Sequence, residues 1–196
     1  MADNRLRRTA ISTARLDLRL LQIGDAGDVF AYARDPAVAK FTSWAAHTKL
    51  ADAEAFVAAA VAADADLPRL VRHTWGIRQR GDATVIGTIG LIQTSATVAE
   101  AHFALARPCW MQGLTSEALQ AVVSWGFEHV AALDEICSGC LADNVGSWRV
   151  LEKSRFRLNH TNVLAFGPKF DHRRLPVRYY ALDRTAWLSA TYTEST

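Results

Sequence analysis

Strict alternation of hydrophobic and polar positions is clearest near the start of the chain. Leucine occupies every second position from Leu16 to Leu20, and Asp17 and Arg19 lie between them. This two-residue period is typical of a strand with one buried face. Alternation, short apolar runs and flanking turn residues predict strands at residues 15–20, 74–78, 85–93, 98–105, 136–141, 156–164 and 177–182.

Helical spacing of hydrophobic positions predicts the other elements. Apolar residues recur every three or four positions after Gly113, as on the buried face of a helix. Asp25 and Thr48 are expected to cap two further helices, because their short side chains can accept a hydrogen bond from the first turn. The predicted helices cover residues 25–34, 49–63, 114–130 and 145–153.

The order of these elements predicts an α/β fold. Strands that follow one another directly favour antiparallel pairing, whereas strand, helix and strand over residues 98–141 favour one parallel crossing. We therefore expect a mixed, mostly antiparallel central sheet flanked by helices. The sheet should splay between the fourth and fifth predicted strands, residues 98–105 and 136–141, so that a ligand can enter there.

The turn around Gly113 is a candidate anion site. It joins a predicted strand to a predicted helix, and the first backbone N–H groups of a helix have no intrahelical partner. These groups and the helix dipole attract a phosphate or pyrophosphate, and a glycine lets the anion approach closely. The alternative is a purely structural turn, since many α/β domains carry such a turn and bind nothing there.

The composition fits one cytoplasmic domain. Half of the 196 residues are hydrophobic, which is enough for a full core. The net charge of +2 favours no polyanionic partner such as DNA. No apolar run approaches the length of a membrane span, and three cysteines suit reduced thiols in the cytoplasm. We expect a flexible leader over residues 1–12, the domain over 13–185 and a tail over 186–196.

Cys137 and Cys140 form a C-x-x-C pair. A zinc site needs two more ligands at suitable spacing, and none is nearby. A redox pair is usually placed at a helix start, whereas these cysteines belong to a predicted strand, where positions i and i+3 face opposite sides. We therefore expect two ordinary core thiols and no metal site.

Motifs of one protein family recur over residues 13–182. The matching segments are residues 13–20 (T-x-R-L-x-L-R), 35–36 with Trp44 (D-P and an aromatic residue), 86–91 (I-G-x-I-G-L), 99–103 (A-E-I-G-Y), 110–119 (W-G-x-G-Y-A-T-E-A-L) and 143–153 (E-N-x-x-S-x-R-V-L-E-K). On these residues the chain resembles the GNAT-superfamily N-acetyltransferases of the RimJ/RimL type, the ribosomal-protein-alanine acetyltransferase branch. The last two segments together are specific, whereas a single segment is not.

The resemblance implies an enzyme that moves an acetyl group from acetyl-CoA to a primary amine. It places the pyrophosphate on the backbone of the turn and the pantetheine arm near Asn144, although Asn144 also suits an N-cap. Backbone amides of the fourth predicted strand would stabilise the oxyanion. The implied cofactor-binding residues are Phe103, Leu105, Gln112, Gly113, Leu114, Thr115, Ser116, Asn144 and Ser147.

Three departures from the family motifs affect this interpretation. Met111 replaces the first glycine of the loop, and Thr115 replaces a small residue. Arg155 replaces a glycine that ends a helix in left-handed conformation, at a cost of about 1 kcal/mol. Met111 and Thr115 motivate an alternative from another class, a non-catalytic acyl-CoA-binding module of the same fold.

Three side chains are candidates for proton transfer. Glu100 and His102 share one face of a predicted strand, so either can take a proton from the amine; alternatively, one pairs with a basic neighbour. Many family members protonate the CoA sulfur with a tyrosine at the position of Leu151. Ser147 lies one turn earlier on the same helix face and is the expected replacement donor, unless it is a solvent-facing serine.

The acceptor amine stays open at the level of sequence. A protein N-terminus, an amino acid, a polyamine and an aminoglycoside all fit, and a homodimer is compatible with the chain. Trp44 and Trp75 are candidates for lining the substrate cleft. The basic stretch from Lys169 to Arg178 is expected to be a solvated loop; the alternative is contact with an acidic peptide or RNA.

Overall fold

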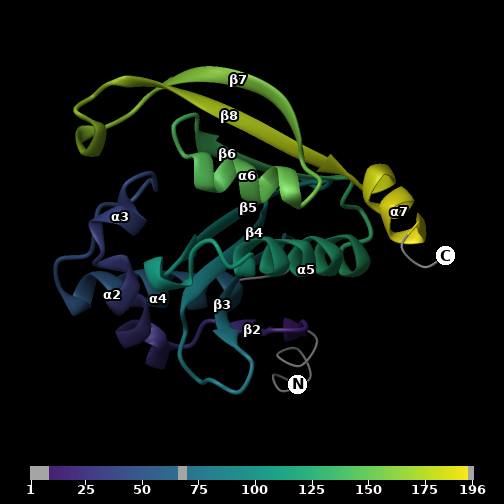
Figure 1. Cartoon of the computed structure of the whole chain (residues 1–196). Helices are drawn as coiled ribbons and strands as arrows, with labels where there is room; N and C mark the ends of the chain where they lie inside the picture. Colours follow the sequence, from purple (N-terminus) through teal and green to yellow (C-terminus); the bar gives the residue numbers. More distant parts are fainter. Residues whose placement is uncertain (1–8, 66–69, 194–196) are drawn as a thin grey trace.

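A mixed sheet lies at the centre of the computed structural model, which describes residues 9–65 and 70–193 (Figure 1). In the described part of the chain the sheet has eight strands in the order β1-β2-β3-β4-β5-β6-β8-β7. The strands are β1 (Ile11–Ser12), β2 (Leu16–Leu20), β3 (Arg72–Gln79), β4 (Gly87–Gln93), β5 (Val98–Leu105), β6 (Glu135–Leu141), β7 (Arg157–Ala165) and β8 (Arg174–Asp183).

The pairing of the strands confirms the predicted fold class. Every neighbouring pair is antiparallel except β5 and β6, which are the fourth and fifth predicted strands and run parallel. Their pairing covers only Val98 to Glu100 on β5 and Glu135 to Cys137 on β6. Beyond these residues the two strands diverge, so the sheet splays where the sequence predicts.

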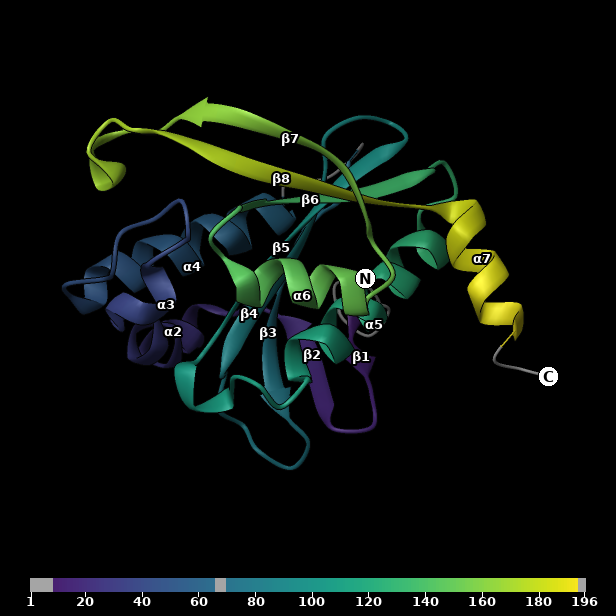
Figure 2. The ribbon, with the colours of Figure 1, turned by 45° about the horizontal axis from the view of Figure 1, so that its top comes forward.

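Helices cover both faces of the sheet. They are α2 (Ala26–Ala33), α3 (Pro36–Ala39), α4 (Leu50–Ala65), α5 (Leu114–His129), α6 (Val145–Lys153) and α7 (Arg184–Thr193), with 3-10 turns η1 (Ile23–Asp25), η2 (Arg107–Cys109) and η3 (Pro168–Phe170). One hydrophobic core lies between β2–β5 and α5, and a second lies under α2 and α4. Figure 2 shows α5 and α6 together, away from α2, α3 and α4.

Two predicted helix caps are wrong. The Asp25 carboxylate does not cap α2; it accepts hydrogen bonds from both terminal nitrogens of Arg19, at 2.6 and 2.7 Å. Thr48 does not cap α4 either, because the Asp52 carboxylate accepts from the Thr48 backbone N–H at 2.9 Å. At α2 the Asp25 carboxylate is held by a charged partner instead, and at α4 the Asp52 carboxylate is the acceptor in place of the Thr48 hydroxyl.

Residues near both ends of the described chain belong to regular elements. Ser12 and Ile11 of the expected leader form β1 against β2, and residues 1–8 lie outside the described residues. Residues 186–193 of the expected tail belong to α7. Arg184 anchors this helix, since its guanidinium donates to backbone carbonyls at the end of α5 and after it. No helix in the described part of the chain is long and apolar enough to span a membrane.

Candidate active site

A pocket of about 320 Å³ opens where β5 and β6 diverge. It passes between the strands and is bordered by the segment after α3, the start of α6, and the hairpin of β7 and β8. The lining residues are Phe41, Thr42, Ser43, Trp44, Glu100, Ala101, His102, Phe103, Ser138, Gly139, Cys140, Leu141, Asn144, Ser147, Leu164, Phe166, Val177 and Tyr179. The sequence-predicted residues Trp44, Glu100, His102, Phe103, Asn144 and Ser147 therefore border one space.

Successive side chains of β5 point to opposite faces of the sheet. Glu100 and His102 project to one face, and Ala101 and Phe103 project to the other, where they pack against the core under α5. Glu100 Oε2 lies 3.6 Å from His102 Nε2, and both side chains are partly exposed. A carboxylate and an imidazole thus stand together at the open part of the sheet, which is where a proton acceptor for an entering amine is needed.

The backbone of β5 presents polar groups to the gap. The Ala101 carbonyl accepts from Ser138 Oγ at 2.8 Å, and the Leu105 carbonyl accepts from Trp110 Nε1 at 2.7 Å, so both point away from β4. Phe103 lies between them, and strand geometry directs its N–H and C=O to the same side. Since the β6 pairing has ended by then, the Phe103 backbone faces the pocket. Leu105 differs, because its side chain is buried outside the pocket and its carbonyl is engaged.

Asn144 and Ser147 form a small hydrogen-bonded unit at the start of α6. The Asn144 side-chain oxygen accepts from the Ser147 N–H at 3.2 Å, so Asn144 is the N-cap of this helix. Its amide nitrogen donates to Ser147 Oγ at 2.8 Å. Because the Ser147 hydroxyl accepts this bond, its own proton is free to be donated elsewhere, and both residues line the pocket.

The predicted anion site lies outside this pocket, at the N-terminus of α5. Gly113 is the N-cap, with a φ of 77°, and the first intrahelical bond runs from the Glu117 N–H to the Gly113 carbonyl. The N–H groups of the residues in between, Leu114, Thr115 and Ser116, therefore have no partner within the helix. The Gln112 side-chain amide donates to the Pro108 carbonyl, so Gln112 has only its backbone groups available for an anion.

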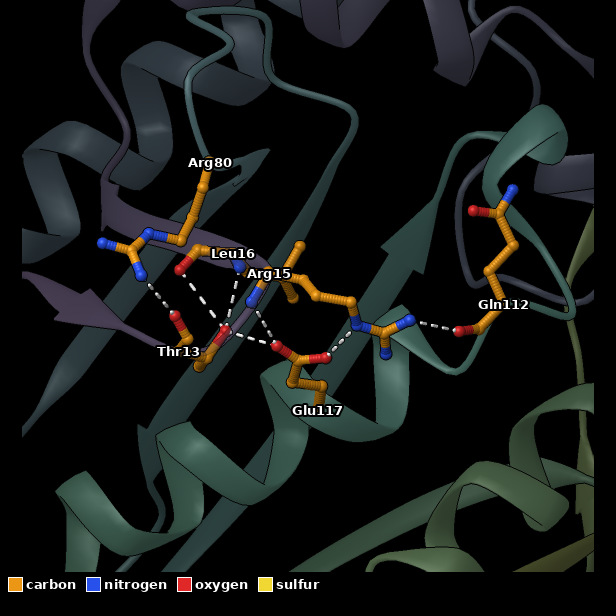
Figure 3. Close-up of polar contacts among 6 residues, drawn as sticks. All are labelled: Thr13, Arg15, Leu16, Arg80, Gln112 and Glu117. Carbon is orange, nitrogen blue, oxygen red and sulfur yellow. Dashed lines mark hydrogen bonds and ion pairs between the residues drawn. The ribbon is translucent and has the colours of Figure 1, made fainter.

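A charged network fixes this loop to the start of the sheet (Figure 3). Glu117, in the first turn of α5, accepts from Arg15 Nε at 2.6 Å, from the Arg15 N–H at 2.9 Å and from Thr13 Oγ1 at 2.6 Å. Arg15 Nη1 donates to the Gln112 carbonyl at 2.9 Å, and Nη2 lies 3.5 Å from where a Cβ on Gly113 would stand. Arg15 was not among the residues predicted from the sequence, although Arg15 and Glu117 both belong to motifs that carry the family resemblance.

The charge of Glu117 is maintained by its partners. Burial alone would raise the pKa of this carboxyl, but the hydrogen bonds from Thr13 and Arg15 and the charge of Arg15 outweigh burial and lower the pKa. Glu117 is therefore ionised at neutral pH and holds the Arg15 guanidinium beside the loop.

The cysteines of the C-x-x-C pair are neutral thiols. Burial raises the pKa of both Cys137 and Cys140 to about 11, and the Glu100 charge adds to the effect at Cys137. Thiolates, not thiols, attack disulfides and bind metals. Within the described residues no cluster of three histidine, cysteine or acidic side chains is placed to hold a metal ion.

The two candidate tryptophans differ in position. Trp44 lines the pocket, but Trp75 is 0% exposed in the core. The Trp75 indole donates to the Thr9 carbonyl at 2.6 Å and packs edge-on against His73 and Trp125. The prediction that Trp75 lines the substrate cleft is therefore wrong, because a residue at the centre of the sheet faces the helix layer rather than solvent.

Residues from the β7–β8 hairpin complete the pocket and were missed by sequence analysis. Phe166 and Tyr179 line it, and Gly139 on β6 leaves room for the Tyr179 ring, which lies 3.3 Å from where a glycine Cβ would stand. No sequence motif marks these positions. Only the hairpin's return over the splay brings them there, as the position of the β7–β8 turn beside α3 shows (Figures 1 and 2).

Lys169 joins this hairpin to the segment after α3. Its ammonium donates to the carbonyls of Ala39 and Thr42 and to Thr42 Oγ1. Burial lowers the pKa of Lys169. The expectation of a solvated basic loop is thus wrong for this residue, because its three N–H donors are all used inside the protein.

These features define a GNAT-type acetyltransferase domain: a mixed sheet, a splayed parallel pair and a helix N-terminus beside the splay. The family model described as Acetyltransferase (GNAT) domain matches residues 15–157, and the chain belongs to this family. Members of the family use acetyl-CoA. A curated relative, Probable N-acetyltransferase YjcK of Bacillus subtilis (strain 168), is 32% identical over 111 residues, which are 54% of this chain and 61% of YjcK. The match thus spans about six-tenths of that relative.

Solved structures share the fold at lower sequence identity. A GNAT-family acetyltransferase from Bacillus anthracis superimposes with a TM-score of 0.76 at 22% identity, over 89% of this chain and 98% of the other. The RimL ribosomal L7/L12 alpha-N-protein acetyltransferase gives a TM-score of 0.75 at 16% identity, over 89% and 93%. At such identities these structures support the fold alone.

Proposed function

We propose that this protein transfers the acetyl group of acetyl-CoA to a primary amine, as a RimJ/RimL-like N-acetyltransferase. The observation that carries the proposal is the composition of the pocket at the splay. It joins a proton acceptor, Glu100 or His102, to a backbone donor at Phe103 and a hydroxyl donor at Ser147. Acyl transfer to an amine needs these three functions around one carbon atom.

The cofactor would lie along the α5 and α6 side of the splay. The free N–H groups of Leu114, Thr115 and Ser116, beside Gly113, suit its pyrophosphate. Arg15 adds a positive charge there, since its guanidinium already faces the loop. Asn144 would contact the pantetheine amides, and the Phe103 N–H would meet the thioester carbonyl.

The chemistry then follows from the pocket's groups. Glu100 or His102 takes the proton of the ammonium; an α-amino group, with a pKa near 8, requires less help than a lysine near 10.4. The amine nitrogen attacks the thioester carbonyl carbon, and the Phe103 N–H stabilises the resulting oxyanion. The carbon–sulfur bond breaks, and the Ser147 hydroxyl donates a hydrogen bond to the departing CoA thiolate. The second proton of the attacking nitrogen passes to that thiolate or to water.

A thiol-release assay tests this function. Purified protein is mixed with acetyl-CoA and a panel of peptide and small amines, and free CoA is measured against a no-amine blank. We expect amine-dependent release that falls sharply in a Glu100→Gln, His102→Gln double variant that still binds acetyl-CoA. Tight acetyl-CoA binding without release on any amine would favour the non-catalytic binding module.

A further inference from the structure

The charges that line the pocket restrict which amine fits. Among the lining residues of the described chain, Glu100 is the one carboxylate, and none is a lysine or an arginine. The thiol of Cys140, with a pKa raised to about 11, is neutral. A single carboxylate can form an ion pair with one ammonium. A second ammonium on the same ligand would therefore lack a counter-charge in the pocket.

Two lysines that contact pocket-lining residues reinforce this limit. Lys169 contacts Thr42 from outside and has all three donors engaged. The Lys40 ammonium lies 4.8 Å from the centroid of the Phe41 ring. Both therefore place positive charge next to the segment after α3 and oppose a second cationic group there.

A carboxylate on the amine would also be disfavoured. In a free α-amino acid the carboxylate is separated from the ammonium by one carbon atom. An ammonium beside Glu100 therefore brings the ligand's carboxylate beside Glu100 as well, and like charges placed together at a site lose affinity. The amide of the same amino acid has no such charge and keeps its shape.

The rest of the lining is aromatic. Phe41 and Trp44 come from the segment after α3, Phe166 from the end of the β7–β8 hairpin, and Tyr179 from β8. Tyr179 is held against His160, with ring centroids 4.6 Å apart. Aromatic walls favour an aromatic or similarly flat apolar body, both by burial and by ring contacts.

We propose, on the basis of the proposed acetyl transfer, that the acceptor is a primary amine with one positive charge on an aromatic body and no second charge nearby. Two sources share this chemistry: a free arylalkylamine and a peptide N-terminus whose first side chain is aromatic. The aromatic body of the ligand would pack against Phe41, Trp44 and Phe166, and its ammonium would pair with Glu100.

Matched amine pairs test the proposal in the thiol-release assay. The pairs are 2-phenylethylamine with ethylamine for the ring, phenylalaninamide with phenylalanine for the carboxylate, and 2-phenylethylamine with spermidine for the second charge. We expect the first member of each pair to have a kcat/KM at least ~10-fold higher, as the loss of one good contact or one charge clash predicts. A phenylalanine-initiated peptide amide, compared with 2-phenylethylamine, identifies which of the two sources is preferred.

Spermidine or free phenylalanine reacting as fast as its partner would overturn the substrate class and leave the acetyl transfer intact. If no amine reacts, binding of the same pairs to the CoA-loaded protein is measured by titration calorimetry. Selective binding of 2-phenylethylamine would then support the substrate class while the proposed reaction fails. Equal or absent binding across the pairs would overturn both.

A pair of variants tests the aromatic residues directly. Trp44→Leu and Phe166→Leu should each lower the ratio of kcat/KM for 2-phenylethylamine to kcat/KM for ethylamine about 10-fold, because contacts with the ring are lost. Leu188→Ala, on an exposed position of α7, serves as the control. Acetyl-CoA affinity and the melting temperature report on folding. An unchanged 2-phenylethylamine to ethylamine ratio in both folded variants would overturn the assignment.

Discussion

Two regions beside the splay are held in different ways. One is the loop before α5, and the other is the aromatic side of the pocket, called here the acceptor lining: Phe41, Trp44, Phe166 and Tyr179. The loop is one continuous segment, and its conformation follows from a left-handed Gly113 and a helix start; one network, Arg15 with Glu117, attaches it to β2. The acceptor lining comes from separate segments. Lys169 connects two of them through hydrogen bonds to Ala39 and Thr42, which lie 130 and 127 residues away in the chain.

The loop and the acceptor lining also differ in the groups that they offer to a ligand. The loop offers backbone N–H groups, which suit the same pyrophosphate whatever the surrounding side chains. The acceptor lining offers side chains, and each of these can change without disturbing the loop. In this molecule the loop before α5, where we propose the cofactor binds, is therefore defined by a motif, and the pocket lining by tertiary contacts. Four changes test that separation, from the largest expected effect to the smallest.

Gly113→Glu should weaken acetyl-CoA binding by about 100-fold or more, because a carboxylate would occupy the space of the phosphate and repel it. Isothermal titration calorimetry measures the affinity. Gly81→Glu is the matched control, since Gly81 has a φ of 82° and no heavy atom within 4 Å of its would-be Cβ. Both variants carry the same backbone strain. Equal affinity in the two folded variants would remove the anion site from the loop.

Ser147→Ala should lower kcat by about 10-fold to 100-fold and leave acetyl-CoA affinity nearly unchanged, since the hydroxyl acts on the leaving sulfur. Steady-state kinetics on the best amine and calorimetry separate the two quantities. Ser189→Ala, on an exposed part of α7, is the control. If kcat of Ser147→Ala equals that of the parent protein, solvent protonates the thiolate and Ser147 is a structural partner of Asn144.

Lys169→Met should raise the acceptor KM about 10-fold without changing acetyl-CoA affinity. Removing the ammonium leaves the Thr42 carbonyl without its donor from Lys169 and takes away one of the donors to the Ala39 carbonyl, which loosens the segment that carries Phe41 and Trp44. The same loss should lower the free energy of unfolding by about 1–3 kcal/mol. Amine kinetics and urea denaturation are the measurements, with Lys49→Met, an exposed lysine, as the control. Weakened acetyl-CoA binding would show that the two sides are not separate.

Met111→Gly should raise the free energy of unfolding by up to about 1 kcal/mol, because Met111 has a left-handed backbone that costs a side-chain-bearing residue this much. The side chain is 95% exposed and contributes little packing. Met111→Ala removes the side chain and keeps the strain, so it should show no gain. Urea denaturation compares the three proteins; equal stability of the glycine and alanine variants would mean that the loop carries no strain there.

Elements with a clear local signal were predictable from the sequence. Period-two alternation predicted β2, the order of strands and helices along the chain predicted a mixed sheet, and helical spacing predicted α5 almost to its observed end at His129. The left-handed conformation of Arg155, with a φ of 69°, also follows from its place at a helix end. Such features depend on a few neighbouring residues, so the order of residues along the chain specifies them.

Other features depended on where the fold places a partner or a side chain. Asp25 is as good a cap as it is an ion-pair partner, and only the position of Arg19 on β2 decides between them. Trp75 has the same amphipathic side chain as Trp44, and only its place at the centre of the sheet buries it.

What the sequence by itself determined is the family, most of the strands and helices in chain order, and the glycine turn at the start of α5, because alternation, helical period and a glycine N-cap are encoded locally. What only the tertiary structure decided is the position of Arg15 beside that turn, the use of Lys169 as an internal contact, and the aromatic lining that faces Glu100. The physical reason is that hydrogen bonds and ring contacts between distant segments are settled by how the sheet twists and where the β7–β8 hairpin returns, and neither is written in any single stretch of the chain.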